Sequence, residues 1–197
     1  LQILYYKYGV FKMRIITGRA RGLKLTTPKN WDVRPTADRV KESLFNIIGS
    51  KIIGAQVLDL FAGTGNLGLE SWSRGAEKIV FTDTSKESLR LVESNIAKCR
   101  AQEDTETICG DACQLIGRLH KKGMSFDFVF ADPPYNKGLV QKVIAALAES
   151  PLLNDGGYLI AEHSAHDELG TLPPQFELVR CETYGETKIS FIRFAKV

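Results

Sequence analysis

The sequence predicts one α/β domain built on a seven-stranded, mostly parallel sheet with helices on both faces. Beyond residue 50, short apolar segments alternate with segments of helical periodicity, which is the pattern of a parallel sheet covered on both sides. The chain has 197 residues, 44% of them hydrophobic and 25% charged, which suits a soluble domain with an apolar core. The last two apolar segments are separated by only "GET", which predicts a hairpin and therefore an antiparallel last strand.

Each expected strand is a short apolar segment that ends in a turn or is followed by a helix. The seven strands are expected at 56–61, 78–83, 105–111, 126–131, 157–162, 177–184 and 188–196. Helices are expected between the first five strands, at 67–74, 85–100, 112–122 and 138–149. In the second of these, Ser85 is a good N-cap, and apolar residues recur at helical spacing after it.

The segment 13–50 is expected to form a small N-terminal element packed on the catalytic domain, 51–197. Its "RIITGRARGLKL" predicts two short strands around a Gly/Arg turn, and 36–49 predicts an amphipathic helix. We interpret 1–12 as an extension ahead of a start at Met13. No apolar run approaches the roughly 20 residues of a membrane helix. The four cysteines form no C-x-x-C pair, which favours reduced thiols in a cytoplasmic protein and neither a metal nor a disulfide framework.

Charge is distributed unevenly along the chain. Residues 1–41 contain ten Lys or Arg against two Asp, a net charge of +8, whereas 42–197 contain 16 basic and 21 acidic residues, a net charge of −5. A basic arm on an acidic body favours a polyanionic partner for the arm, and nucleic acid is the expected one.

The turn after the first strand, "GTGNLG", matches the G-x-G-x-x-G pattern of nucleotide-binding turns at Gly63, Gly65 and Gly68. Asp59 precedes this turn by four residues, and a carboxylate there would repel a pyrophosphate. It suits instead a ligand with an amino group and a cationic sulfur. S-adenosyl-L-methionine has both and carries no phosphate, so we predict it as the cofactor, with S-adenosyl-L-homocysteine as the product.

Further acids follow the next two strands. Asp83 ends the second strand about 20 residues after the glycine turn, where an acid binds ribose hydroxyls. Asp111 follows the third strand, where it would accept a hydrogen bond from the adenine amino group. The neighbouring Phe61, Thr84 and Ala112 complete the expected cofactor site together with Asp132.

The fourth strand, "FDFVFA", ends in Asp132-Pro133-Pro134-Tyr135. An exocyclic amine is a poor nucleophile because its lone pair is delocalised, so methylation needs acceptors that hold its N–H groups and aim the lone pair. Asp132 would accept one hydrogen bond and the Pro133 carbonyl the other, in a turn held by the fixed φ of proline. Tyr135 would stack on the flipped base. This D-P-P-Y resembles motif IV of the amino-methyltransferases.

Taken together, the chain resembles the RsmD family, bacterial methyltransferases of a guanine N2 in small-subunit (16S) ribosomal RNA. The resemblance runs from about 13 to 194 and includes "MRIITGRARGLKL", "RPTADRVKESLFNII", "VLDLFAGTGNLGLESWSRGA", "FDFVFADPPY" and "YGETKIS". It implies a Rossmann-like class I methyltransferase fold, S-adenosylmethionine as donor, and 16S rRNA as partner. Presentation of the rRNA within a small-subunit assembly particle is a separate expectation, based on the small size of the protein. Family members more often carry Glu where this chain has Asp83.

The basic residues of the N-terminal element are the expected RNA contacts. Those of the predicted hairpin would grip phosphates, which position RNA without reading its sequence; they are Arg14, Arg19, Arg21 and Lys24. Arg34, Thr36 and Arg39 begin the following helix and would line the mouth of the site, against RNA or donor.

Other functions remain open at this stage. A DNA or RNA adenine-N6 methyltransferase also uses D-P-P-Y, although only about 50 residues here lie outside the sheet and no long insertion follows Tyr135. Protein-glutamine methyltransferases more typically have Asn in place of Asp132. A binding module with a degenerate donor site is disfavoured by the intact glycine turn.

Overall fold

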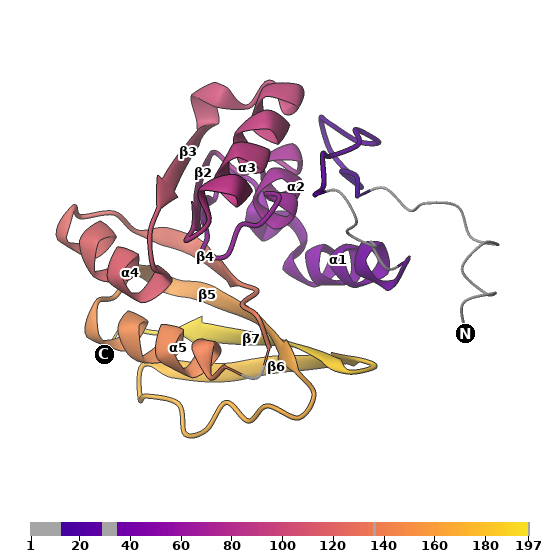
Figure 1. The fold of residues 1–197 in the computed structure, drawn as a ribbon. Coiled ribbons are helices and arrows are strands. Elements are labelled where there is room, and N and C mark those ends of the chain that lie inside the picture. The colour runs from indigo at the N-terminus through magenta and orange to yellow at the C-terminus, as the bar shows by residue number, and fades with distance from the viewer. Residues whose placement is uncertain (1–12, 29–34, 136, 197) are drawn as a thin grey trace.

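A seven-stranded sheet in the order β3-β2-β1-β4-β5-β7-β6 forms the centre of the protein (Figure 1). The computed structural model describes 13–28, 35–135 and 137–196, with only the backbone for 35–37. The strands are β1 Gln56–Asp59, β2 Lys78–Asp83, β3 Thr105–Cys109, β4 Phe126–Ala131, β5 Leu153–Ser164, β6 Phe176–Tyr184 and β7 Thr187–Phe194. The helices are α1 Pro35–Ile48, α2 Asn66–Ser73, α3 Lys86–Cys99, α4 Ala112–Lys121 and α5 Leu139–Glu149, with short 3-10 helices η1 Gly49–Ile52 and η2 Gln102–Asp104.

The strand directions confirm the predicted fold class. The pairs among β1, β2, β3, β4 and β5 are parallel, and β7 runs antiparallel to both β5 and β6. Ser85 caps α3 as predicted, because its side chain accepts a hydrogen bond from the amide of Ser88. β1 ends two residues earlier than predicted, at Asp59, where the chain bends into the glycine turn. β5 starts four residues earlier than predicted, because "NDGG" is extended there despite its turn-like composition.

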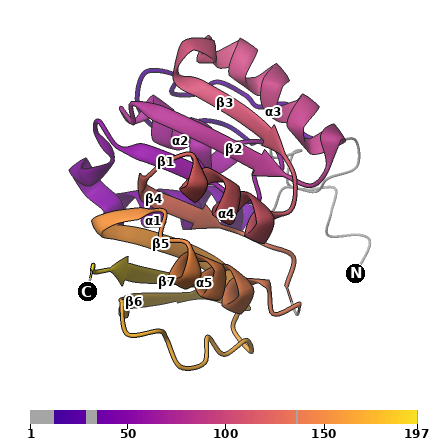
Figure 2. The same cartoon turned by 90° about the vertical axis from the view of Figure 1, so that its left-hand side faces the viewer.

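Two apolar layers separate the helices from the sheet, one on each face. α4 and α5 cover one face, which Figure 2 views from the front. The other face is covered by α1, α2 and α3, and the N-terminal element contributes Ile15 and Leu25 to the same layer. Alternate residues of a strand point to opposite faces of the sheet, so the position of a residue in its strand decides which of the two layers its side chain faces.

The N-terminal element is held against α2 through backbone contacts. Its two segments pair antiparallel at Arg14 and Lys24, and the turn between them rests on the end of α2. Gly18 has φ +90°, and a Cβ at this position would lie 1.8 Å from the carbonyl oxygen of Ser73. The Ser73 hydroxyl donates to the carbonyl of Thr17. This turn therefore requires glycine for its φ and for its closeness to the helix.

A buried ion pair joins the segment 13–28 of this element to α1 and α2. Lys41 and Glu70, 2% and 0% exposed, lie 3.3 Å apart between Nζ and Oε2. Lys41 also donates to the carbonyl of Arg14 and to Asn66 Oδ1, each at 2.7 Å. Glu70 accepts from the amides of Ile16 and Thr17 and from Arg74 Nε. Asn66 belongs to the glycine motif "GTGNLG", so this pair links the N-terminal element to the candidate cofactor site.

Within the described part of the chain, no helix combines the length and apolar character that crossing a membrane requires.

Candidate active site

Four acids stand at the carboxyl ends of four adjacent strands and share one face of the sheet. They are Asp59 on β1, Asp83 on β2, Asp132 after β4 and Glu162 on β5. The residues two positions before them all belong to the apolar layer beneath α1 to α3, namely Val57, Phe81, Phe130 and Ile160. Because strand side chains alternate, the acids face that same side. Among the described residues none of the four forms an ion pair with Lys or Arg, so this edge is suited to a cationic ligand.

The glycine turn lies between β1 and α2 at this edge. Gly63 and Gly65 have φ +55° and +78°, a region that other residues rarely adopt. A Cβ on Gly63 would meet only the Phe61 carbonyl, at 3.9 Å, so the turn leaves open space beside its backbone. A Cβ on Gly68 would lie 2.2 Å from the Phe81 ring, so this glycine allows α2 to pack closely on the sheet. The predicted turn is thus one with room for a ligand.

Asp59 is almost enclosed beneath this turn. It is 2% exposed, and its Oδ2 accepts a hydrogen bond of 3.0 Å from the Gly68 amide. Burial raises the pKa of Asp59 to about 7, the Gly68 hydrogen bond lowers it, and the charge of Asp83 raises it further. No described residue donates a hydrogen bond to its Oδ1. One carboxylate oxygen therefore remains available to a cation.

Asp83 connects β2 to the glycine turn. Its Oδ2 accepts from the Gly63 amide at 3.0 Å, and its Oδ1 accepts from the Ser85 amide at 2.8 Å. Each carboxylate oxygen accepts more than one hydrogen bond. Asp83 thus shapes the turn while it retains acceptor capacity for a ligand.

The remaining predicted cofactor contacts lie beside these acids with varied exposure. Asp111 is exposed and caps α4 by accepting a 3.1 Å hydrogen bond from the Gln114 amide. Ala112 is buried as the first residue of that helix, and Thr84 is exposed after β2. Phe61 is partly buried against the layer beneath α4 and α5. Their contacts with a cofactor stay predictions.

Asp132 and Tyr135 occupy the mouth of the site at the end of β4. Asp132 is exposed to solvent although it is surrounded by protein, so it lies in a recess that remains open. Limited hydration of the charged form raises its pKa, and the charges of Glu162 and Asp59 raise it further. The Tyr135 hydroxyl donates to Glu162 Oε1 at 2.6 Å and contacts Thr187 Oγ1 at 2.9 Å. These two contacts fix the ring, which is 37% exposed.

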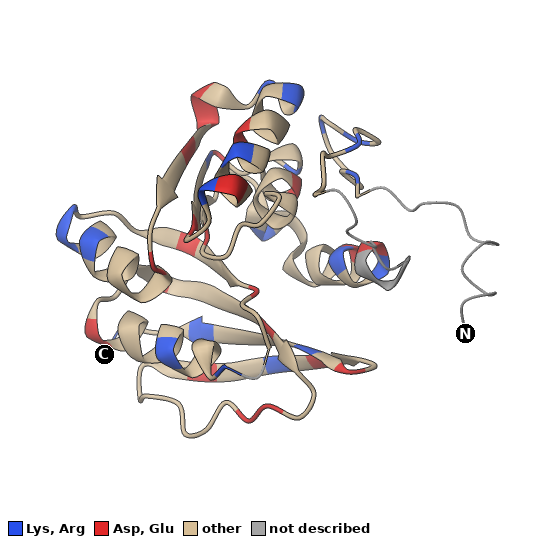
Figure 3. Cartoon of the chain, in the orientation of Figure 1, with Lys and Arg blue, Asp and Glu red and all other residues tan. Residues whose placement is uncertain are grey.

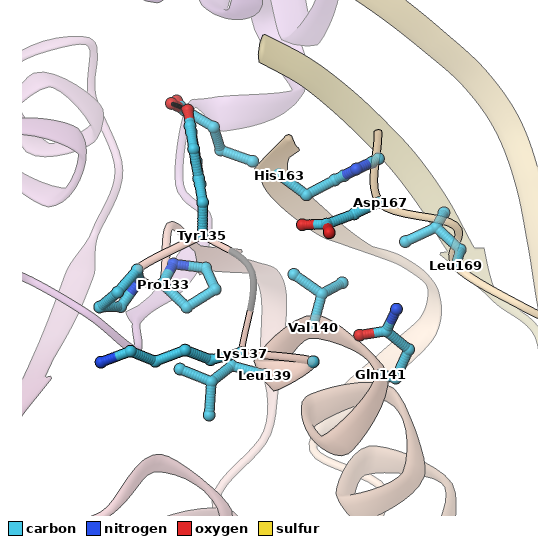
Figure 4. A pocket seen from close by; sticks show the side chains of 12 residues that line it. Pro133, Tyr135, Lys137, Leu139, Val140, Gln141, His163, Asp167 and Leu169 are labelled. Carbon is cyan, nitrogen blue, oxygen red and sulfur yellow. Dashed lines mark hydrogen bonds between the residues drawn. The ribbon is translucent and has the colours of Figure 1, made fainter. Parts of the chain in front are cut away.

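A pocket opens beside this motif, between the loop after β4, the start of α5 and the segment after β5. Figure 4 shows Tyr135 and Pro133 on one side of it, with His163, Asp167 and Leu169 across from Val140. Pro133 is buried and Pro134 is exposed, so the two prolines turn the chain from the core to the surface.

Several of the N-terminal cations have acidic partners within the protein. Arg14 Nε lies 3.2 Å from Asp38 Oδ2. The Arg19 guanidinium lies over the Trp72 ring at 3.8 Å and 3.6 Å from Asp104 Oδ2. Figure 3 shows blue basic segments on this element and on α1.

Three of the predicted RNA contacts have no such partner. Arg21, Lys24 and Arg39 form no ion pair among the described residues, and all three are exposed. Thr36 lies in α1 but its side chain is not described, and Arg34 lies outside the described residues.

Two residues of this region escaped the sequence reasoning. Glu162 ends the apolar run "GYLIAE", and its alternation with Tyr158 and Ile160 was the available signal. Lys41 is one of several charged residues in α1, and no sequence pattern distinguished it from an exposed helical lysine.

The sheet order, the glycine turn and the acids at successive strand ends together define the class of protein. They are the features of Rossmann-like methyltransferases, and D-P-P-Y stands at the end of the fourth strand.

The chain belongs to the family described as "Conserved hypothetical protein 95", whose model matches 13–193. "Ribosomal RNA small subunit methyltransferase D" of Escherichia coli (strain K12) is 34% identical over 178 residues, which cover 90% of this chain and 88% of that protein. The solved structure of yhhF from Escherichia coli has a TM-score of 0.84 and 32% identity, covering 94% of this chain and 99% of that chain. SMU.776, solved in complex with SAH, is 17% identical with a TM-score of 0.64 over 82% of this chain and 50% of that one, a likeness of fold alone. The resemblance to the RsmD family is confirmed.

Proposed function

We propose that this protein transfers a methyl group from S-adenosyl-L-methionine to the exocyclic N2 of a guanine in small-subunit (16S) ribosomal RNA. One observation carries the proposal. D-P-P-Y stands at the same edge of the sheet as the acids expected to bind the donor, Asp59, Asp83 and Asp111, and none of these acids has a cationic partner among the described residues. The relative named ribosomal RNA small subunit methyltransferase D, 34% identical over most of both chains, supports RNA as the substrate.

The donor fits the residues that are present. Asp59 Oδ1 is available for its ammonium group, Asp83 retains acceptor capacity for the ribose, and the open side of the glycine turn admits a nucleoside. Asp111, at the next strand end, would accept from the adenine amine. When bound, S-adenosylmethionine supplies an electrophilic methyl group on a cationic sulfur, whose charge the surrounding carboxylates favour.

The target amine would be held by the D-P-P-Y turn. Asp132 accepts one N–H of the amine and the Pro133 carbonyl accepts the other, which favours a pyramidal nitrogen with its lone pair directed at the methyl carbon. A charge-assisted hydrogen bond of this kind contributes on the order of 1.5–3 kcal/mol. Tyr135, fixed through its hydroxyl, stacks on the flipped base with about 1–3 kcal/mol. Alignment of the two reacting groups supplies the larger part of the acceleration.

The exposed cations of the N-terminal element are proposed to bind the phosphates of the RNA, and Arg21 is the first candidate among them. We infer that the rRNA is presented within a partly assembled small subunit, because the phosphate contacts proposed for the N-terminal element position RNA without reading its sequence. Methylation of naked 16S rRNA and of assembly particles at equal concentration tests this point. Faster methylation of naked RNA would contradict it.

The decisive experiment incubates the protein with labelled donor and total RNA, followed by nuclease mapping of the modified base. The expected product is N2-methylguanosine at one position of small-subunit rRNA. Parallel incubation with DNA tests the adenine alternative, and N6-methyladenine in either nucleic acid would overturn the proposal.

A further inference from the structure

Glu162 stands beside Asp132 as a direct consequence of strand register. Ala131 of β4 pairs with Ala161 of β5 in parallel, so the next residue on each strand is an acid. Neighbouring strands lie about 4.8 Å apart, and residues in register point to the same face. The two carboxyl groups therefore project side by side into the amine-binding end of the site.

The hydrogen bonds of Glu162 leave half of its carboxyl group available. Oε1 accepts from the Tyr135 hydroxyl at 2.6 Å, and no described residue donates to Oε2. No Lys or Arg among the described residues pairs with this carboxyl group. Glu162 also lines the pocket beside D-P-P-Y, together with Pro133, Pro134 and Tyr135. Its second oxygen is thus an acceptor held close to the position of the target base.

The base proposed to enter this site presents two adjacent donors. The Watson–Crick edge of guanine carries N1–H next to the N2 amine, whereas adenine carries an unprotonated N1, an acceptor, next to its N6 amine. Ionised carboxyl groups only accept hydrogen bonds. If Asp132 accepts from the amine, the neighbouring carboxylate meets the atom adjacent to that amine. It would attract N1–H and repel a bare N1.

We propose that Glu162 is a specificity-determining residue that accepts a hydrogen bond from guanine N1–H and so selects guanine over bases with an unprotonated ring nitrogen beside the amine. The inference rests on the proposed function and adds the means by which the base is recognised. It requires the register of β4 and β5 and an Oε2 to which no described residue donates.

A purely structural role for Glu162 would act through Tyr135. The test therefore separates recognition of the base by Glu162 from positioning of the Tyr135 ring. Small-subunit rRNA is prepared with guanine or with 2-aminopurine at the mapped position. The analogue keeps the 2-amine but has an unprotonated N1. Glu162→Gln offers an amide that donates to that N1, while Tyr135→Phe removes the Tyr135–Glu162 hydrogen bond and leaves both the ring and the carboxyl group.

The measured quantity is the ratio of kcat/KM for guanine to that for 2-aminopurine. We expect wild type and Tyr135→Phe to prefer guanine by at least about 100-fold, and Glu162→Gln to reduce the preference to within about tenfold. Donor affinity near that of wild type verifies that each variant is folded, and Glu162→Ala, expected to lose the preference as well, provides a second variant.

Three results would overturn the assignment. They are an unchanged preference in both Glu162 variants, an equal loss in Tyr135→Phe, and a wild type that does not distinguish the two bases. Failure of the proposed function looks different, since the wild type would then form no N2-methylated product from the guanine substrate.

Discussion

The acids at the strand ends and the cations of the N-terminal element are arranged in opposite ways. Asp59, Asp83 and Asp132 have no cationic partner among the described residues, whereas Arg14, Arg19 and Lys41 are each paired with an acid. Unpaired charges gathered in a recess are raised in free energy and are relieved by a ligand. Paired charges already stabilise the fold. The first region is therefore prepared for binding, and much of the second maintains the structure.

This comparison assigns different consequences to charge removal in the two regions. Loss of a strand-end acid should affect activity or donor affinity and leave the fold intact. Loss of a paired cation should affect the free energy of unfolding. Arg21 is one of the exposed, unpaired cations of the N-terminal element, and its loss should affect RNA binding alone.

Removal of the Asp132 carboxyl group should have the largest effect. Asp132→Ala is expected to lower kcat by at least about a hundredfold, because the target amine loses the acceptor that aligns it. Donor affinity, measured by calorimetry, should stay within a few-fold of wild type. Asp132→Asn, which keeps an acceptor oxygen of the same shape, should retain more activity than the alanine variant. Near-normal turnover of Asp132→Ala would remove this residue from the mechanism.

Removal of the buried lysine should chiefly destabilise the protein. Lys41→Ala leaves Glu70 with a buried charge and removes the donor to the Arg14 carbonyl, so the free energy of unfolding should fall by about 3 kcal/mol. Arg39→Ala, an exposed change two residues earlier on α1, is the matched control and should stay within about 0.5 kcal/mol of wild type. Denaturant unfolding measures both. Equal effects would contradict the distinction between paired and exposed cations.

Donor affinity should depend on pH through Asp59. Burial raises its pKa in the free protein to about 7, and an ionised Asp59 is needed to attract the donor ammonium. Affinity should therefore rise as pH increases from 6 to 8, with a limiting slope of about tenfold per pH unit below the pKa. Asp59→Asn should flatten this rise, and the neighbouring Asp83 and Asp132 would account for any slope that remains. A wild-type profile that is level over this range would contradict the assignment.

The raised pKa of Asp59 also makes the free energy of unfolding depend on pH. Between the unfolded value of about 3.8 and the folded value of about 7, the folded state holds a proton that the unfolded state has lost. This group therefore contributes a loss of stability as pH rises through that window and no further change above it. Asp59→Asn should remove that contribution.

Reversal of the exposed cation should have the smallest effect. Arg21→Glu is expected to weaken RNA binding several-fold and to reduce the slope of log K against log salt by about one. Arg19→Glu should instead lower the free energy of unfolding, since it loses the Trp72 ring and Asp104. Salt titrations of binding and denaturant unfolding of both variants give the comparison. If the salt slope of Arg21→Glu equals that of wild type, this residue does not contact phosphate.

The predicted positions were most accurate where the backbone repeats regularly. Asp83 was placed at the end of β2 and Ser85 at the cap of α3, because strand alternation and capping depend on residues within a few positions of each other. Glu162 obeyed the same alternation but was overlooked, since its neighbour on the sheet, Asp132, lies 30 positions earlier in the chain. Its importance arises from register between strands, which is a contact between distant segments.

The long cations of the N-terminal element were harder to interpret for a physical reason. Arg19 was predicted to grip phosphate, yet its guanidinium lies on Trp72 and beside Asp104, more than 50 positions away. A flexible side chain of this length reaches partners on several elements, and local sequence does not determine which. Lys41 shows this more strongly. Its position in the pattern of α1 is that of an ordinary exposed lysine, yet in the structure it is 2% exposed.

By itself, the sequence determined the α/β class, the antiparallel last strand, the glycine turn and the acids that follow the strands. These depend on periodicity, backbone freedom and residue type over short distances, which the chain carries locally. Only the tertiary structure decided which charges are paired, that Asp59 is nearly enclosed, and that Glu162 stands beside Asp132. Those properties depend on burial and on register between distant segments, and they determine whether a charge stabilises the fold or remains available to bind a ligand.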